Sequence, residues 1–259
     1  TDRESIGKEK AGILRPGRPA VIADPNPPES IRESNPNAEF FRYNREWSVL
    51  EGQGKDNFME LFLQNAQRTE KRYRFFPPKG ILATNTGASI QSLTLLGFEP
   101  SEEQLSDVSQ DFLLVGRLQS FLLNGCEILI DVAHNPSAVA TLARHIEAKK
   151  VVGENYAIFA ALKDKDIVNM LTGICDIFTA WFIPDLPEVS RGAHSNDIKK
   201  IVSEIGGTDI TTWHNTKDAW DAVWKLMVPG DRLVIFGSFY TISDVLPLIQ
   251  SIRDGTKSG

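Results

Sequence analysis

Short apolar runs alternate with amphipathic segments throughout the part of the chain that follows Gly116. The apolar runs predict strands at residues 127–131, 156–160, 177–182, 210–213 and 233–236. Strands that are apolar at nearly every position are typical of a sheet covered by helices on both faces. Since a helix-length segment follows each run, we expect strand–helix units and a mostly parallel sheet.

The segments between the runs have helical periodicity. Pro136 suits the first turn of a helix, where its missing N–H costs nothing. The apolar residues after it stand at the spacing of one helix face: Val139, Leu142, Ala143 and Ile146. Pro247 falls inside the last helical pattern, so we expect it to kink that helix or to mark its start.

The first 115 residues are less regular, and this change of pattern predicts two domains. We expect a short buried strand near residues 20–23, a loop with a short helix over 25–36, and strands near 40–43, 47–50 and 58–63. Asn85 is the expected N-cap of a helix with Ile90, Leu93 and Leu96 on one face. A further short helix is expected to begin at Ser101.

Basic and aromatic residues gather once, between positions 68 and 75: Arg68, Lys71, Arg72, Tyr73, Arg74 and Phe75. Such a cluster suits either a single-stranded nucleic-acid surface or a solvated edge strand, since edge strands are commonly charged. The chain as a whole carries a net charge of −6. The acidic balance favours the edge strand.

Composition and charge exclude several classes. An apolar share of 41% and a charged share of 24% are ordinary for a globular protein and exclude a disordered, collagen-like or coiled-coil chain. The acidic net charge argues against a nucleic-acid or anionic-membrane binder. Cys126 and Cys175 lie in or beside apolar runs and are expected to be reduced core thiols. With no apolar signal segment at the start, a cytoplasmic location is expected.

Two predicted strands end in polar residues. Asp131 to Pro136 brings an acid, an imidazole and an amide to the end of one strand, and Gly237-Ser238 follows the last. In a parallel sheet, ligands bind where strands end and helices begin. Each motif alone suits either plain helix capping or chemistry. The sequence contains neither a dinucleotide-binding glycine motif nor a phosphate-binding P-loop.

Read together, these motifs resemble a known family. The string from Arg3 to Ile13 resembles a signature of the folylpolyglutamate synthase/dihydrofolate synthase family. Five further features follow in that family's order and approximate spacing: Asn85, Gly116-Arg117, Asp131 to Pro136, Asp164-Lys165-Asp166 and Gly237-Ser238-Phe239. The motif at Asp131 is shared across the Mur ligase superfamily, but cell-wall ligases usually have Tyr where this chain has Val132. The resemblance spans essentially the whole chain and favours the folate branch.

The resemblance implies an α/β protein with two parts. Residues 1–114 would be the C-terminal part of a P-loop-type central ATPase domain whose P-loop lies upstream. Residues 115–259 would be a Rossmann-like, mostly parallel C-terminal domain. The implied activity is ATP-dependent addition of L-glutamate to dihydropteroate or a tetrahydrofolate (poly)glutamate through an acyl phosphate. Mg²⁺ and ATP are implied, and a monovalent cation is a further candidate cofactor.

The resemblance also implies roles for six residues. Lys10 matches a lysine that becomes a carbamate and approaches Mg²⁺, with the other metal ligands expected upstream; the alternative is an unmodified lysine in a salt bridge. Asn85, Arg117 and Asp131 match nucleotide-contacting positions. His134 and Ser238 match positions that face the acyl phosphate and glutamate.

Without a P-loop, the isolated chain is expected to be inactive. Two alternatives stay open: a non-catalytic nucleotide- or folate-binding fragment, and another Mur-type amide ligase. The expected partners are small molecules, namely ATP, folate or dihydropteroate, and L-glutamate. We expect no nucleic acid, no membrane and a monomer. The form of the opening signature suggests a bacterial, bifunctional enzyme.

Overall fold

The computed structural model describes residues 2–53, 58–111 and 114–255. The chain divides into two compact units, Thr1–Leu113 and Leu114–Gly259. Within the described residues, no helix is long and apolar enough to cross a membrane.

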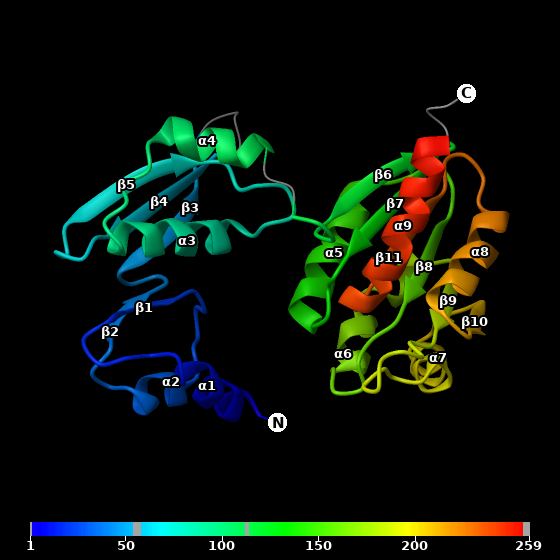
Figure 1. Ribbon diagram of the computed structural model, residues 1–259, viewed down its shortest axis with the longest axis horizontal. Coiled ribbons are helices and arrows are strands. Elements are labelled where there is room, and N and C mark those ends of the chain that lie inside the picture. Colours follow the sequence, from blue (N-terminus) through cyan, green and yellow to red (C-terminus); the bar gives the residue numbers. More distant parts are fainter. Residues whose placement is uncertain (1, 54–57, 112–113, 256–259) are drawn as a thin grey trace. The chain divides into compact units, whose positions relative to one another are not determined.

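The second unit is built on one six-stranded sheet (Figure 1). Its strands are β6 (Gln119–Leu123), β7 (Cys126–Asp131), β8 (Asn155–Phe159), β9 (Ala180–Pro184), β10 (Ile210–Trp213) and β11 (Arg232–Phe236). They lie in the order β10-β9-β8-β11-β7-β6, and every neighbouring pair is parallel except β6 and β7. The expected mostly parallel α/β fold is confirmed.

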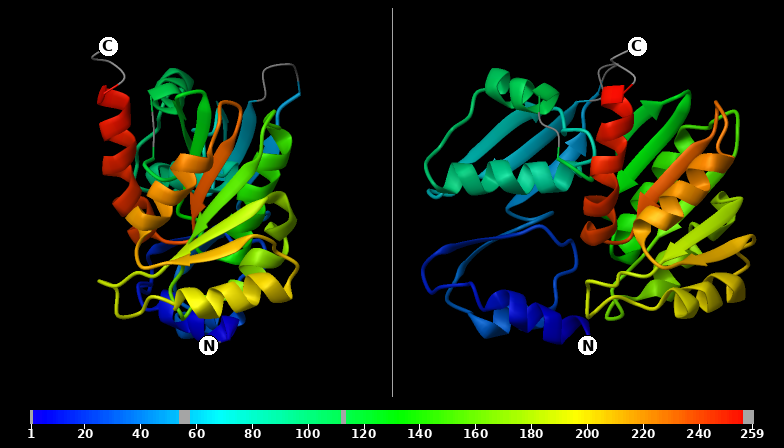
Figure 2. Two further views of the ribbon diagram at one scale, coloured as in Figure 1. Left: turned by 90° about the vertical axis from the view of Figure 1, so that its right-hand side faces the viewer. Right: turned by 45° about the vertical axis from the view of Figure 1, so that its right-hand side comes forward.

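Helices cover both faces of this sheet. They are α5 (Pro136–Ala148), α6 (Ile167–Thr172), α7 (Ser195–Glu204), α8 (Thr216–Leu226) and α9 (Phe239–Gly255). Apolar residues of α5, α6 and α7 join one core cluster, and those of α8 and α9 join another. Figure 2 shows α9 and α5 on opposite sides of the strands. This covering explains why β11 is buried at every position.

One strand and one boundary differ from expectation. The sequence pattern missed β6, which pairs antiparallel with β7 through a tight turn at Asn124 and Gly125. Both turn residues have positive φ, as a two-residue hairpin requires. The strand expected over residues 177–182 begins only at Ala180, because Cys175–Ile177 forms a 3-10 turn. Pairing with β8 starts there, opposite Tyr156.

Other local expectations hold. Pro136 is the first residue of α5, after the N-cap Asn135. Pro247 lies inside α9, so it does not mark the start of that helix. Cys126 and Cys175 are both free and buried, and burial raises the pKa of each thiol.

The first unit contains two small sheets. α1 (Arg3–Ala11) precedes β1 (Pro19–Ile22), α2 (Glu29–Ser34) and β2 (Glu39–Arg42), and β1 pairs parallel with β2. The strands β3 (Trp47–Glu51), β4 (Met59–Gln64) and β5 (Glu70–Phe75) form an antiparallel sheet, followed by α3 (Ala83–Leu95) and α4 (Glu102–Asp111). Side chains of this sheet and of α3 share one core cluster.

The expected start and face of α3 are wrong. The N-cap is Leu82, and Asn85 lies within the first turn. Leu93 and Leu96 are exposed. The buried positions follow helical spacing, but on another face: Gly87, Ile90, Gln91 and Thr94. Polar members of that face donate to backbone carbonyls, Gln91 to that of Gln64 at 2.7 Å and Thr94 to that of Ile90 at 2.9 Å, so polarity at these positions conceals the true core face.

The basic aromatic cluster belongs to an edge strand. β5 lies at one edge of the antiparallel sheet. The Arg72 guanidinium lies 5.2 Å from the centre of the Phe62 ring, and Arg74 lies 3.9 Å from that of Phe58. These cation–π contacts occupy the arginines within the fold. The geometry supports the edge-strand interpretation.

Candidate functional site

Two of the motifs identified in the sequence lie side by side at one edge of the second unit's sheet. β7 and β11 are parallel neighbours, and Asp131 is the register partner of Phe236. The segments that leave these strands, from Asp131 to Pro136 and from Gly237 to Phe239, therefore emerge at the same edge. This edge is formed by the carboxyl ends of the strands, and it is where open parallel sheets bind ligands.

Asp131 fastens the turn that carries Arg117. One carboxylate oxygen accepts a hydrogen bond from the Leu118 backbone N–H at 2.8 Å. The turn is also closed by Gln119, whose side-chain oxygen accepts from the Gly116 N–H at 3.1 Å. Leu118 has a φ of 41°, an unusual left-handed conformation that these contacts must hold in place.

Burial dominates the electrostatics of Asp131, whose exposed fraction is 5%. Burial raises the pKa of this carboxyl above its usual value, while the Leu118 hydrogen bond and the nearby positive charge of Arg117 counteract part of the rise. Arg117 is itself only half-buried. The pair thus places a solvent-accessible cation beside a buried carboxylate.

His134 lies just before α5. Asn135 is the N-cap and accepts a hydrogen bond from the Ala138 N–H at 2.9 Å. The His134 Nδ1 atom lies 2.8 Å from the Val132 carbonyl oxygen. A carbonyl can only accept, so Nδ1 carries the proton of this bond. In the neutral ring, Nε2 is therefore the acceptor.

The segment after β11 completes this edge. Gly237 has a φ of 106°, and a Cβ there would lie 2.5 Å from the Ala160 carbonyl oxygen. Only glycine fits this backbone. Ser238 is buried, and its hydroxyl accepts from the Tyr240 N–H at 3.2 Å. Phe239, which sequence reasoning gave no role, lies with its ring 6.3 Å from that of His134.

The structure thus brings four of the six sequence-predicted residues to one edge: Arg117, Asp131, His134 and Ser238. Gln119 was missed, because a glutamine on a short strand carries no sequence signal of its bond to a turn. Lys10 and Asn85 belong to the first unit. Lys10 is exposed in the last turn of α1, and no salt bridge to it exists within residues 2–53, 58–111 and 114–255.

The residues present do not build a metal site on their own. In the described part of the chain, no group of three or more His, Cys, Asp or Glu side chains could hold a metal ion. Asp166, in the acidic Asp164-Lys165-Asp166 motif, instead caps α6 by accepting from the Asn169 N–H at 3.3 Å. A carbamate on Lys10 would supply one ligand, so these residues alone do not fit a bound Mg²⁺.

Comparisons with known proteins identify the class. The family described as "Mur ligase, glutamate ligase domain" matches residues 116–239, the range that contains the edge just described. Dihydrofolate synthase/folylpolyglutamate synthase of Buchnera aphidicola (subspecies Schizaphis graminum) is 30% identical over 257 residues, which are 98% of this chain and 57% of that protein. The protein of the same name in Escherichia coli is 29% identical over 99% of this chain and 58% of its own length.

Solved structures agree with this result. Escherichia coli FolC in complex with DHPP and ADP matches with a TM-score of 0.80 and 27% identity, covering 98% of this chain and 58% of that one. A bifunctional folylpolyglutamate synthase/dihydrofolate synthase with Mn, AMPPNP and L-glutamate bound matches with a TM-score of 0.79 and 26% identity, over 96% of this chain and 58% of that chain.

The fold and the shared edge define a Mur ligase glutamate ligase domain in the second unit. Along nearly its whole length the chain is similar to proteins named dihydrofolate synthase/folylpolyglutamate synthase. It spans a little under three fifths of the length of the curated relatives it matches.

Proposed function

We propose that this chain is part of an ATP-dependent ligase that adds L-glutamate to dihydropteroate, a tetrahydrofolate (poly)glutamate, or both. The observation that carries the proposal is the shared edge of β7 and β11, where Asp131, His134 and Ser238 emerge within the glutamate ligase domain. Related solved structures hold ADP, or AMPPNP with L-glutamate, which supports the same chemistry. The reaction class is acyl transfer in folate metabolism through an acyl phosphate.

Arg117 and Asp131 are proposed to contact the nucleotide. A guanidinium pairs with phosphate oxygens, and Arg117 is accessible to do so. Asp131 has one oxygen engaged by the Leu118 N–H, so its other oxygen could accept a ribose hydroxyl. Its hydrogen bond to Leu118 also positions Arg117. The two residues would act as one clamp.

His134 and Ser238 are proposed to face the acyl phosphate and glutamate. With Nδ1 fixed on the Val132 carbonyl, the Nε2 edge of His134 is the edge left to meet a substrate. It could accept the proton that the attacking amine loses, or donate to an anion when protonated. The Ser238 hydroxyl is the less accessible of the two, because it is buried and engaged at the start of α9.

Lys10 and Asn85 are the two proposed functional residues of the first unit. No salt bridge to Lys10 is seen within the described residues, so the alternative role as an ion-pair partner has no support there. An exposed lysine is also free to react with CO₂. The Asn85 side-chain amide could read an adenine edge. Mg²⁺ would need ligands in addition to a Lys10 carbamate, and a monovalent cation is a further candidate cofactor.

The experiment compares two proteins. The chain extended at its N-terminus to the length of its relatives should release ADP in the presence of glutamate and dihydropteroate or tetrahydrofolate. The 259-residue chain should release none, because its sequence has no P-loop. Glutamate-dependent ADP release by the shorter chain would contradict the proposed dependence on an upstream P-loop.

A substrate panel tests the alternatives. Turnover of a cell-wall peptide precursor in place of a folate would indicate another Mur-type ligase, which Val132 disfavours. Binding of nucleotide without any turnover in the extended protein would indicate a non-catalytic module. We propose that the protein acts as a cytoplasmic monomer on small molecules, which size-exclusion chromatography and cell fractionation would check.

A further inference from the structure

We propose that a pocket in the first unit binds an aryl carboxylate, that is, a small molecule with a flat ring and one carboxylate. The pocket has a volume of about 390 Å³, which suits a small-molecule site. It opens beyond the carboxyl ends of the parallel strands β1 and β2, since it is lined by Ile22 and Asp24 after β1 and by Arg42 and Tyr43 at and after β2. None of the six residues assigned above lines it.

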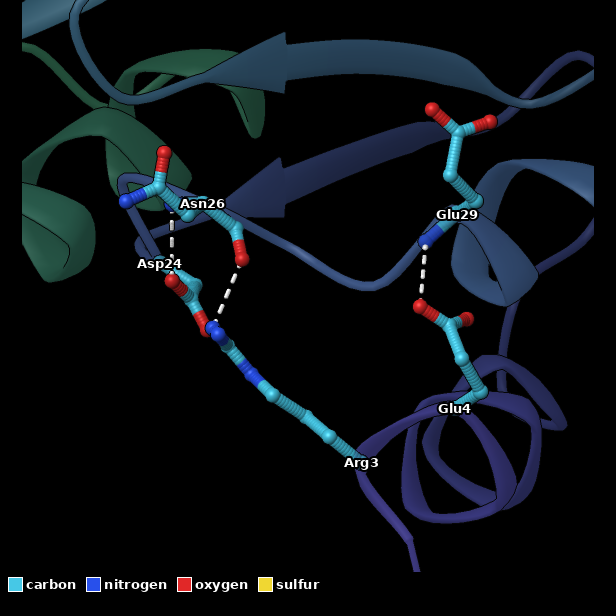
Figure 3. A network of polar contacts seen from close by, with 5 residues as sticks. All are labelled: Arg3, Glu4, Asp24, Asn26 and Glu29. Carbon is cyan, nitrogen blue, oxygen red and sulfur yellow. Dashed lines mark hydrogen bonds and ion pairs between the residues drawn. The ribbon is translucent and has the colours of Figure 1, made fainter.

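One wall of the pocket is held rigid by α1. Arg3 donates to the Asp24 carboxylate and to the Asn26 carbonyl oxygen, each at 2.6 Å, as Figure 3 shows. Glu4 accepts from the Ser30 N–H at 2.9 Å and the Glu29 N–H at 3.3 Å. These bonds fix both ends of the wall.

The composition of that wall adds to its rigidity. Three of its residues are prolines with fixed φ: Pro25, Pro27 and Pro28. Gly7 of α1 packs so closely on this wall that a Cβ would lie 2.6 Å from the Ser30 hydroxyl oxygen. A wall ordered before binding loses little entropy when a ligand enters.

The charges of the pocket divide into paired and unpaired groups. Asp24 is neutralised by Arg3, and Arg42 by Glu46, whose carboxylate lies 2.7 Å from its guanidinium. Arg32 and Arg45 also line the pocket, and neither has an ion-pair partner in the part of the chain that the structure describes. Glu29 supplies one negative charge. The balance is one net positive charge, which matches a monoanion.

The remaining lining selects a flat apolar body rather than a bare anion. Phe40 and Tyr43 contribute two aromatic side chains, and Ile22 and Ile31 contribute aliphatic ones. Tyr43 is itself held by Trp47, with ring centres 4.9 Å apart. Guanidinium groups bind carboxylates through paired hydrogen bonds. Aromatic walls beside two unpaired guanidiniums therefore favour an aryl carboxylate.

The test titrates the 259-residue chain with four probes and follows binding by NMR. 2-Naphthoate carries both features, acetate and inorganic phosphate carry only the anion, and 2-naphthylmethylamine carries the ring with the opposite charge. We expect 2-naphthoate to bind with a dissociation constant on the order of 1 mM, and the other three at least tenfold more weakly.

Variants locate the site. Arg32→Gln and Arg45→Gln should each weaken 2-naphthoate binding about tenfold, since each removes a charge-assisted contact. Arg144→Gln is the matched control, because Arg144 is also exposed, lies in the second unit and should leave binding unchanged. Circular dichroism checks that all variants fold. The proposal would be overturned if Arg32→Gln and Arg45→Gln bound 2-naphthoate as tightly as the parent protein does. Phosphate binding as tight as that of 2-naphthoate would overturn it too.

Discussion

The Leu118 backbone N–H donates to the Asp131 carboxylate across the β6–β7 hairpin, at 2.8 Å. This bond joins the turn that carries Arg117 to the end of the neighbouring strand. Because burial raises the pKa of Asp131, the ionised carboxylate is costly in the folded state and the bond offsets part of that cost.

The pH dependence of stability should show this cost. A carboxyl with a raised pKa in the folded state binds protons more readily when folded, so its contribution to stability falls as pH rises above the ordinary aspartate value. The asparagine of Asp131→Asn does not ionise in this range, so the variant lacks this pH-dependent loss of stability. We expect the stability of this variant relative to the parent to increase with pH through the acid range, measured by urea unfolding. A constant or decreasing difference would show that the folded-state pKa is not raised.

Arg117 and His134 should affect different kinetic constants in the extended enzyme. Arg117→Ala and Asp131→Ala are expected to raise the KM for ATP about ten- to a hundredfold, because each removes a charge-assisted contact. His134→Ala should lower kcat or raise the KM for glutamate, with little change for ATP. Steady-state kinetics with each substrate varied in turn will distinguish them. If His134→Ala weakens ATP binding as much as Asp131→Ala does, His134 and Asp131 both bind the nucleotide and the proposed division of roles is wrong.

Lys10 offers a chemical rescue test. Lys10→Ala in the extended enzyme should lose most activity, and added formate or acetate should restore part of it by replacing the carbamate's oxygen atoms. Lys8 is the matched control, because it is also exposed in the last turn of α1. Lys8→Ala should keep near-normal kcat. Near-normal kcat in Lys10→Ala would show that the carbamate is not needed.

A buried ion pair at the amino-terminal ends of β7 and β11 should contribute strongly to the stability of the second unit. Arg232 is buried, contacts the Glu127 carboxylate at 2.8 Å and donates to the Ile146 and Lys149 carbonyls near the end of α5. Arg232→Met removes the cation that pairs with Glu127 and the donor to these carbonyls, and should cost about 3–5 kcal/mol of unfolding free energy.

Urea denaturation would measure that loss. Lys217→Met removes an exposed pair with Asp221 on α8 and serves as the control, with a much smaller expected effect. Equal effects of the two substitutions would mean that the buried pair contributes no more than a surface one.

Gly237→Ala should be destabilising by about 2 kcal/mol or more, since its φ is positive and the new Cβ would collide with the Ala160 carbonyl oxygen. Gly173→Ala is the matched control, because a Cβ there meets no atom within 4 Å and its φ is not positive. Thermal unfolding of both variants gives the comparison. A Tm for Gly237→Ala equal to that of the control would mean that the backbone can relax at this position.

The sequence predicts the sheet of the second unit well because its strands are buried on both faces. Leu233 to Phe236 is an uninterrupted apolar run for that reason, and the same is true of Ile128 to Ile130. The edge strand β6 escaped detection because its side chains are mostly half-exposed and do not form such a run. Its turn signal, Asn124-Gly125, was nevertheless present in the sequence.

Helix α3 shows why a face can be misassigned. Leu93 and Leu96 are apolar but exposed, while Gln91 and Thr94 are polar but buried, and each donates a hydrogen bond to a backbone carbonyl. Hydrophobicity alone cannot rank these positions. Similarly, the motif at Asp131 predicts which residues gather at one edge, but not that Asp131 bonds to the turn of Arg117, since that contact depends on a strand the pattern missed.

The Asn124-Gly125 turn has a consequence for how the protein tolerates insertions. Hairpin tips usually accept extra residues, but this turn sets the register of β6 against β7, with Gln119 opposite Ile130. A slip of one residue would move β6 by about 3.4 Å and exchange the faces of its side chains. Arg117 would then be displaced from Asp131, although the turn lies at the far end of both strands. The length of this turn, and not only its sequence, therefore determines the position of Arg117.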